Sequence, residues 1–273
     1  MKLKRIASAF LAGALALSLA ACDGSASTSA AASASGSAAG SASAAAGSDL
    51  DYIKGKGKMV IGYTVYEPMN YTDADGNFTG FDTELATAVC AKLGVEPEFV
   101  EINWDTKQIA LNTKEIDLIW NGMTIKNELK EYMAFTDSYM ENKQVVVCKK
   151  TDAAKFTDVA SIKASGAEVY VENGSAAETV CTENGITLTD AQKAGKQADC
   201  LLEVKAKTNA IAILDITLAK AMTGDGTNYS DLTYVDVGFA GEEYGIGVRK
   251  SDTEFLEKLN AIIAKYKTDG TFD

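Results

Sequence analysis

Short apolar segments alternate with helix-forming segments through most of this chain. The segments that read as strands are MVIGYTV (59–65), EFVEI (98–102), IDLIW (116–120), KQVVVCKK (143–150), EVYV (168–171) and AIAIL (210–214). Such alternation is typical of parallel sheets with helices packed on their faces. We therefore predict an α/β fold. In such sheets, ligands bind at the carboxyl ends of the strands.

Helix starts can be read from capping residues. Asp82 is a candidate N-cap for the helix in GFDTELATAVCAKLG, and Ser251 with Glu254 has the spacing of a capping box before the last helix. Ser175 and Glu178 repeat that spacing directly after the strand EVYV. The segment NELKEYMAF (127–135) is also predicted to be helical.

The N-terminus carries a targeting segment, residues 1–22. Basic residues precede an apolar run that is too short and alanine-rich for a membrane span. The run ends in Leu19-Ala20-Ala21-Cys22, which resembles the lipobox of bacterial lipoproteins and implies cleavage before Cys22 with a lipid such as palmitate on that cysteine. The alternative is an ordinary signal peptide. Residues 23–49 are almost all Ser, Ala and Gly, as in a flexible tether.

Charge and composition exclude several classes of site. The net charge is −12 and the chain contains no histidine, so we predict no nucleic-acid partner, no metal site, no cofactor and no His-based catalysis. Cys90 and Cys148 lie in apolar runs and are predicted to be core thiols. A disulfide between Cys181 and Cys200 is left open.

The turns that follow the strands resemble one family, the polar amino-acid binding proteins of bacterial ABC importers (extracellular solute-binding proteins, family 3). The phrases that carry the resemblance are GYTVYEPMNYTDADGNFTGFDTELA, VEPEFVEINWDTKQIALNTKEIDLIWNGMTI, FTDSYMENKQVVV, ENGSAAE, AIAILD and EEYGIGVRKSDT. Together, in this order, they are specific and cover nearly the whole body of the chain.

The resemblance implies a two-lobed periplasmic-binding-protein-like fold of type II, with two crossing strands between the lobes and the ligand in the cleft. Lobe 1 would comprise residues 50–147 and 239–273, and lobe 2 residues 148–238.

Ligand-binding residues can be carried over where this sequence matches the family pattern. The resemblance implies that Tyr66 and Trp104 form aromatic walls around the ligand. Asn121, Gly122 and Thr124 would form the turn that binds the ligand carboxylate, and Ser175 at a helix start would complete that carboxylate site. Asp215 would bind the α-ammonium group. From the residues alone, core packing is the favoured reading of Tyr66 and Trp104, and Asp215 could cap the next helix.

One position departs from the family pattern. Relatives carry an arginine, which grips the ligand carboxylate, where this chain has Leu129. Beyond the signal segment the only arginine is Arg249, which lies in a segment that relatives do not use for the carboxylate. Either Lys126 substitutes as a point charge, or the ligand lacks an ordinary free carboxylate.

The predicted function is therefore capture of an amino acid or related amine by a monomeric, lipid-anchored protein on the outer face of the cytoplasmic membrane. It would deliver the ligand to an ABC permease and its ATPase. The alternatives are an enzyme of the cyclic amino-acid dehydratase type on the same scaffold, for which Glu67 and Glu172 are the candidate acids, and a ligand sensor for a receptor kinase.

Overall fold

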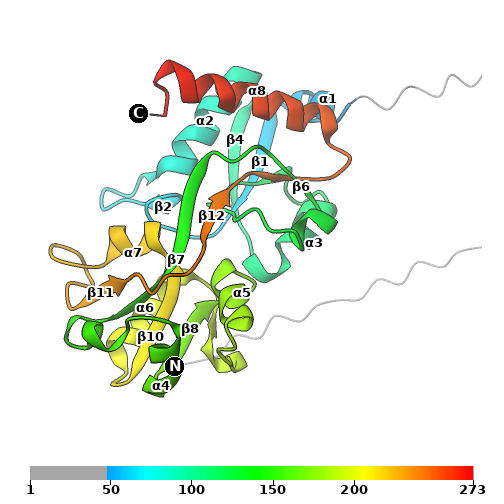
Figure 1. Ribbon diagram of the computed structural model, residues 1–273. Helices are drawn as coiled ribbons and strands as arrows, with labels where there is room; N and C mark the ends of the chain where they lie inside the picture. Colours follow the sequence, from blue (N-terminus) through cyan, green and yellow to red (C-terminus); the bar gives the residue numbers. More distant parts are fainter. Residues whose placement is uncertain (1–47, 273) are drawn as a thin grey trace, which may run out of the picture. The chain divides into compact units, whose positions relative to one another are not determined.

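The computed structural model describes residues 48–272, which belong to one compact unit (Figure 1). The targeting segment, Cys22 and nearly all of the tether lie outside the described residues. Within the described residues, no helix is both long and apolar enough to cross a membrane. The strands form two larger sheets and a small hairpin of β2 (Tyr71–Thr72) with β3 (Phe78–Thr79).

The first sheet has five strands in the order β4-β1-β5-β13-β6. They are β1 (Lys58–Tyr63), β4 (Glu96–Glu101), β5 (Leu118–Ile119), β6 (Ala134–Phe135) and β13 (Gly247–Val248). β1 runs parallel to β4 and β5, whereas β13 is antiparallel to both of its neighbours.

Helices cover both faces of this sheet because alternate strand residues point to opposite sides. Met59 and Ile61 of β1 join the core formed with α1 (Asp49–Lys56), α2 (Phe81–Leu93) and α8 (Thr253–Asp269). Val60 belongs to a separate core that includes α3 (Lys107–Asn112). We call this sheet with these four helices lobe 1.

The second sheet has the strand order β11-β7-β10-β8-β9, with β12 also paired to β7. Its members are β7 (Met140–Lys149), β8 (Glu168–Glu172), β9 (Lys193–Ala194), β10 (Ala210–Asp215), β11 (Leu232–Val235) and β12 (Gly241–Tyr244). β8 is parallel to β9 and β10, whereas β7 is antiparallel to β10, β11 and β12.

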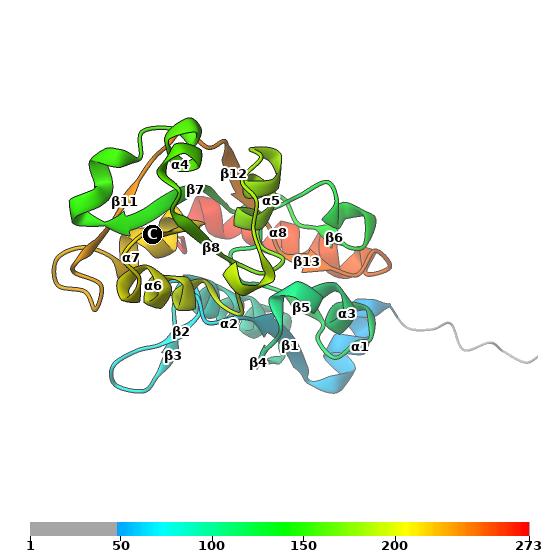
Figure 2. The ribbon, with the colours of Figure 1, turned by 90° about the horizontal axis from the view of Figure 1, so that it is seen from below.

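The second sheet is also covered on both faces, as Figure 2 shows. Val145 and Val147 of β7 pack with α6 (Gln197–Ala206) and α7 (Ile216–Met222). Val146 between them packs with α4 (Val159–Ser165) and α5 (Ala176–Glu183). We call this sheet with these four helices lobe 2. The 3₁₀ helices are η1 (Trp104–Thr106), η2 (Leu129–Glu131), η3 (Lys150–Lys155) and η4 (Asp190–Gln192).

Two neighbouring strands carry the chain between the lobes. β12 pairs with residues 140–143 of β7, and residues 144–147 of β7 then pair with β10 inside the second sheet. In Figure 1, β7 runs as one long strand beside β12 from one sheet to the other. The expected α/β fold with two crossing strands is therefore confirmed. The lobe boundaries at 147/148 and 238/239 stay a prediction.

Three local expectations were wrong. Gly80, not Asp82, is the N-cap residue of α2, and the Asp82 side chain is buried below the first turn instead. The expected capping box of Ser251 and Glu254 does not form, because Asp252 is the N-cap residue of α8 and its side chain makes no cap hydrogen bond. The segment 127–135 forms only the short η2, followed by β6.

The four cysteines of the described residues are free and buried, so no Cys181–Cys200 disulfide is present. Cys181 packs in the core with α4 and β8, whereas Cys200 packs in the core that contains α7. The two thiols therefore lie on opposite faces of the second sheet. The prediction of core thiols is confirmed for Cys90 and Cys148.

Candidate functional site: the cleft between the lobes

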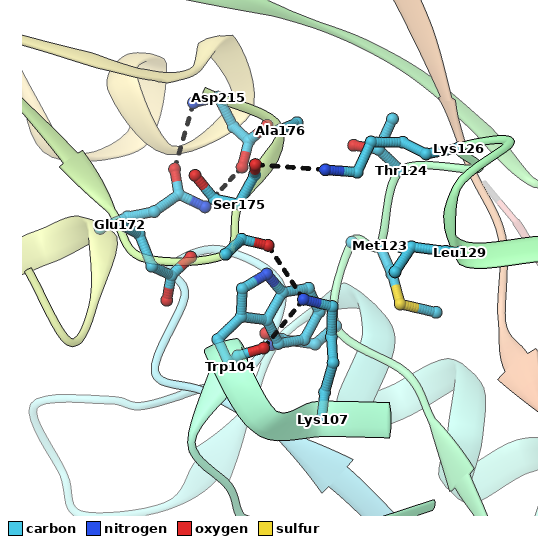
Figure 3. A pocket seen from close by; sticks show the side chains of 14 residues that line it. Trp104, Lys107, Met123, Thr124, Lys126, Leu129, Glu172, Ser175, Ala176 and Asp215 are labelled. Atoms are coloured by element: carbon cyan, nitrogen blue, oxygen red, sulfur yellow. Dashed lines mark hydrogen bonds between the residues drawn. The ribbon is translucent and has the colours of Figure 1, made fainter. Parts of the chain in front are cut away.

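A cavity lies between the lobes (Figure 3). Lobe 1 and its connecting loops contribute Trp104, Lys107, Asn121, Gly122, Met123, Thr124, Lys126 and Leu129. Lobe 2 contributes Glu172, Gly174, Ser175, Ala176, Gln197 and Asp215. The cavity volume is about 20 Å³, which is little more than the space one water molecule needs. The lobes are therefore closed on each other, and they must part to admit an amino-acid-sized molecule.

Two lysines of lobe 1 reach across the cleft to the start of α5. Lys107 Nζ donates to the Gly174 carbonyl at 2.9 Å and to the Trp104 carbonyl at 2.8 Å. Lys126 Nζ donates to the Ser175 carbonyl at 3.2 Å and to Thr179 Oγ1 at 2.9 Å. Burial lowers the pKa of Lys107 to about 8, and the charge of Lys126 adds to this effect. Burial likewise lowers the pKa of Lys126.

The turn after β5 is held from beneath by its own neighbours. Asn121 Nδ2 donates to the Thr64 carbonyl at 2.8 Å, and Asn121 Oδ1 accepts from the Thr64 hydroxyl at 2.9 Å. The Gly122 amide donates to Asp82 Oδ2 at 2.6 Å. Burial raises the pKa of Asp82 to about 7. The hydrogen bonds from the Gly122 amide and the Tyr139 hydroxyl oppose this effect. The side chain of Asn121 and the amide of Gly122 therefore shape the turn, and Thr124 lies at the cavity.

Asp215 ends β10, and three amide side chains hold its carboxylate. Asn142 Nδ2 and Gln144 Nε2 donate to Oδ1 at 2.6 and 2.7 Å, and Gln197 Nε2 donates to Oδ2 at 2.5 Å. Asp215 occupies the N-cap position of α7, but its side chain makes no cap hydrogen bond to that helix. Neutral donors fix the orientation of the carboxylate and leave its charge uncompensated.

A second acid faces the cavity close to Asp215. Glu172, the last residue of β8, is 3% exposed, and its Oε1 has no hydrogen-bond partner among the described residues. Burial raises the pKa of Glu172 to about 8, and the charge of Asp215 raises it further. The sequence predicted a role for Glu172 only in the alternative function, as a candidate acid of a dehydratase on this scaffold.

The two aromatic walls implied by the resemblance differ in position. Trp104 lines the cavity with 7% of its surface exposed, and Lys107 Nζ lies 4.6 Å from its ring centre. Tyr66 is 1% exposed, and its hydroxyl bonds the Tyr244 hydroxyl at 2.7 Å. A side chain at Gly122 would meet the Tyr66 ring at 2.7 Å. Tyr66 therefore lies behind the turn and does not line the closed cavity.

All the other predicted ligand-binding residues line one cavity. Ser175 is also the predicted helix cap, because its hydroxyl oxygen accepts a hydrogen bond from the Glu178 amide at 3.4 Å. Sequence reasoning missed Lys107, Gln197 and the amides of β7. Lys107 follows Trp104 by three residues, which places both on one side of a helical turn. Asn142 and Gln144 alternate along β7, a period that places them on one face.

Comparison with known proteins places the chain among exported binding proteins. Residues 59–273 match the family model for bacterial extracellular solute-binding proteins, family 3. The histidine-binding periplasmic protein of Salmonella typhimurium is 30% identical over 218 residues, which cover 76% of this chain and 81% of that protein.

Two solved structures are similar over most of their length. The ancestral amino acid-binding protein that is a precursor of cyclohexadienyl dehydratase superposes with a TM-score of 0.74 at 31% identity, covering 83% of this chain and 96% of that one. An ABC uptake transporter substrate-binding protein from Streptococcus pneumoniae with bound histidine gives 0.73 at 29% identity, covering 82% and 92%.

Proposed function

The chain belongs to the bacterial extracellular solute-binding proteins, family 3, and on this premise we propose that it captures an amino acid between its lobes and delivers it to an ABC permease. The observation that carries the ligand class is the Asp215 carboxylate, buried at the cleft and oriented by three neutral amides. Such a carboxylate suits the α-ammonium group of an amino acid or a related amine, because a buried charge needs an opposite charge.

The other ligand contacts follow from the lining of the cleft. Trp104 would cover the ligand side chain. Thr124, Ser175 and the turn around Asn121 and Gly122 would surround the carboxylate, with Lys126 as its nearest cation. Tyr66 would support the turn from behind. Closure of the lobes around the ligand would present a single surface to the permease.

A thermal-shift screen of the body, residues 50–273, with amino acids, decarboxylated amines and short peptides tests this function. A ligand that binds only the folded chain raises its stability by about 2.7 kcal/mol at a hundredfold excess over its dissociation constant. No shift with any amino acid would contradict the proposal.

We also propose binding without turnover. The named relative is a binding protein, and among the described residues neither Asp215 nor Glu172 is hydrogen-bonded to the Thr124 or Ser175 hydroxyl that lines the same cavity. The rival is a dehydratase, which would use the Glu172 carboxyl as its acid or base. Incubation of the protein with its best thermal-shift ligand, followed by mass spectrometry, separates the two. Conversion of the ligand would favour the dehydratase.

Membrane attachment through Cys22 is the third part of the proposal. The lipobox-like LAAC and the tether 23–49 support an anchored body on the outer face of the cytoplasmic membrane. Cys22→Ala is expected to release the protein from the membrane fraction without changing its melting temperature, because the tether separates anchor from body. A variant that stays in salt-washed membranes would contradict the anchor.

The carboxylate of the ligand is expected to contribute little to affinity. Leu129 lines the cavity where relatives carry arginine, and both cleft lysines already donate to lobe 2 oxygens. The amide of a bound amino acid should therefore bind within about tenfold of the free acid, roughly 1.4 kcal/mol. Leu129→Arg should increase the preference for the free acid.

Calorimetry with the matched acid and amide measures this preference. Lys126→Ala is the informative control. A preference above about a hundredfold in the native protein, lost in Lys126→Ala, would show that this lysine leaves Ser175 and takes the carboxylate. The same preference retained in Lys126→Ala would assign the carboxylate to the turn and the start of α5.

A further inference from the structure

The Glu172 carboxyl group is an unsatisfied feature of the cleft. It is 3% exposed, lines the cavity, and has an Oε1 atom that no described residue bonds. β8 and β10 are parallel neighbours, so Glu172 and Asp215 stand at the same edge of the sheet. A buried polar atom without a partner costs free energy. A ligand group that bonds this oxygen would recover that cost.

A hydrogen bond from the Thr64 side chain lowers the pKa of Glu172, but no described residue bonds its Oε1. Lys107 is the cation that faces it, but its Nζ is directed to the carbonyl oxygens of Trp104 and Gly174. The other charged groups that face Glu172 are Asp215 and Asp199, and both repel its negative form. The space next to this carboxyl group therefore favours a positive charge that comes from outside the chain.

The acids near Asp215 also favour a cationic ligand group. Two buried acids, Glu172 and Asp215, line the cavity together with Lys107 and Lys126, and the half-buried Glu242 lies next to Asp215. Glu242 accepts from the same two amides of β7 that hold Asp215. Burial raises the pKa of both Glu172 and Glu242 to about 8, with Asp215 adding to each. A cation placed next to Glu172 and Asp215 would favour the charged form of Glu172, whereas a ligand with a neutral side chain would not.

We propose that Glu172 is a specificity-determining residue that accepts a cationic group on the ligand side chain while Asp215 holds the α-ammonium group. The ligand class is then the basic amino acids. This inference rests on the proposed function, because it assumes that the cleft binds an amino acid. A ligand with a neutral side-chain amide could also bond Oε1, but it would not stabilise the charged form of Glu172 beside Asp215.

Arginine and citrulline are suitable probes because they have nearly the same shape and differ in side-chain charge. Lysine and norleucine form a second pair. In calorimetry at pH 7, the native protein is expected to bind arginine at least tenfold more tightly than citrulline. Glu172→Gln is expected to reduce this ratio to about threefold or less, with citrulline itself changing less than threefold. Glu168→Gln is the matched control, since it removes a carboxylate from the exposed start of the same strand.

The number of protons released on ligand binding is a second measurement, and it would not change if Glu172 had only a structural role. Glu172 is largely protonated at pH 7 without ligand, since its pKa is about 8. An adjacent cation favours the charged form, so arginine binding should release a proton. Calorimetry in two buffers with different ionisation enthalpies measures that release. The release should be larger with arginine than with citrulline in the native protein and in Glu168→Gln, and this difference should disappear in Glu172→Gln, because Glu242 beside Asp215 responds to both ligands alike.

The possible outcomes separate this inference from the proposed function. Equal binding of arginine and citrulline by the native protein would overturn the role of Glu172 and leave amino-acid capture intact. A preference for arginine that survives in Glu172→Gln would overturn it as well. Binding of none of the four probes, nor of any amino acid in the thermal-shift screen, would overturn both. If Glu172→Gln melts at a lower temperature than the native protein, Glu172→Asp serves as the second variant. It keeps the charge on a shorter side chain and should retain part of the preference for arginine.

Discussion

Asp215→Asn is expected to weaken the binding of an amino acid at least tenfold. The carboxylate is 7% exposed and is held by neutral amides, so the ligand ammonium would be its only cationic partner at bonding distance. Truncating one partner of a buried charge pair typically costs about 2–5 kcal/mol. Asparagine keeps the shape and loses the charge. Its amide nitrogen would also face a donor nitrogen of Asn142, Gln144 or Gln197, which adds to the loss.

Isothermal calorimetry measures this change, and the melting temperature without ligand shows whether the amide cage still folds. Asp236→Asn is a matched control, because that acid lies in lobe 2 but pairs with Lys143 at the surface. Its removal should leave the dissociation constant unchanged. An unchanged dissociation constant in Asp215→Asn would mean that Asp215 only holds β7 and α6 in place.

Gly174→Ala is expected to weaken ligand binding by about 5–150-fold, because the added methyl group obstructs closure. A Cβ at Gly174 in lobe 2 would lie 2.8 Å from Asp105 Cα in lobe 1, a backbone atom that cannot swing away. Overpacking of this kind costs about 1–3 kcal/mol, which corresponds to that range of affinity. Lobes that have parted would not make this contact, so the penalty is expected to fall on the closed form.

Gly166→Ala separates this effect from backbone strain. Gly166 has φ +62, close to the +69 of Gly174, but its added Cβ would meet nothing within 4 Å. Both variants should lose about 1–2 kcal/mol of stability from the left-handed conformation. Only Gly174→Ala should lose affinity in calorimetry. Equal affinities in the two variants would show that closure does not bring Gly174 and Asp105 into contact.

The alternation of strands and helices was readable from the sequence because it depends on local periodicity. Val145, Val146 and Val147 form one apolar run, and such a run is typical of a strand buried on both faces. The turns that hold Asn121, Ser175 and Asp215 could also be placed, since they follow predicted strands and match the family phrases. The structure brings these turns together at one cavity.

Partners that are distant in sequence could not be predicted in this way. The Asp82 carboxylate bonds the Gly122 amide, and Lys107 bonds the Gly174 carbonyl across the cleft. Neither contact leaves a local pattern, because each joins elements that approach only in the folded chain. Asp82 was mistaken for a helix cap because aspartate at the start of a helix usually has that role. Tyr66 was placed at the cavity by resemblance, whereas the aromatic packing behind Gly122 buries it.

Because the thiols are buried, we expect oxidants outside the cell to oxidise the cysteines of this protein mainly before it has folded. Burial raises the pKa of Cys90 and Cys181 to about 12 and that of Cys148 to about 11, and it also raises the pKa of Cys200. The reactive thiolate is therefore scarce in the folded chain. An unfolded chain exposes all four thiols at ordinary acidity, so wrong disulfides form in competition with folding. Bound ligand lowers the unfolded population and would protect the thiols without touching them.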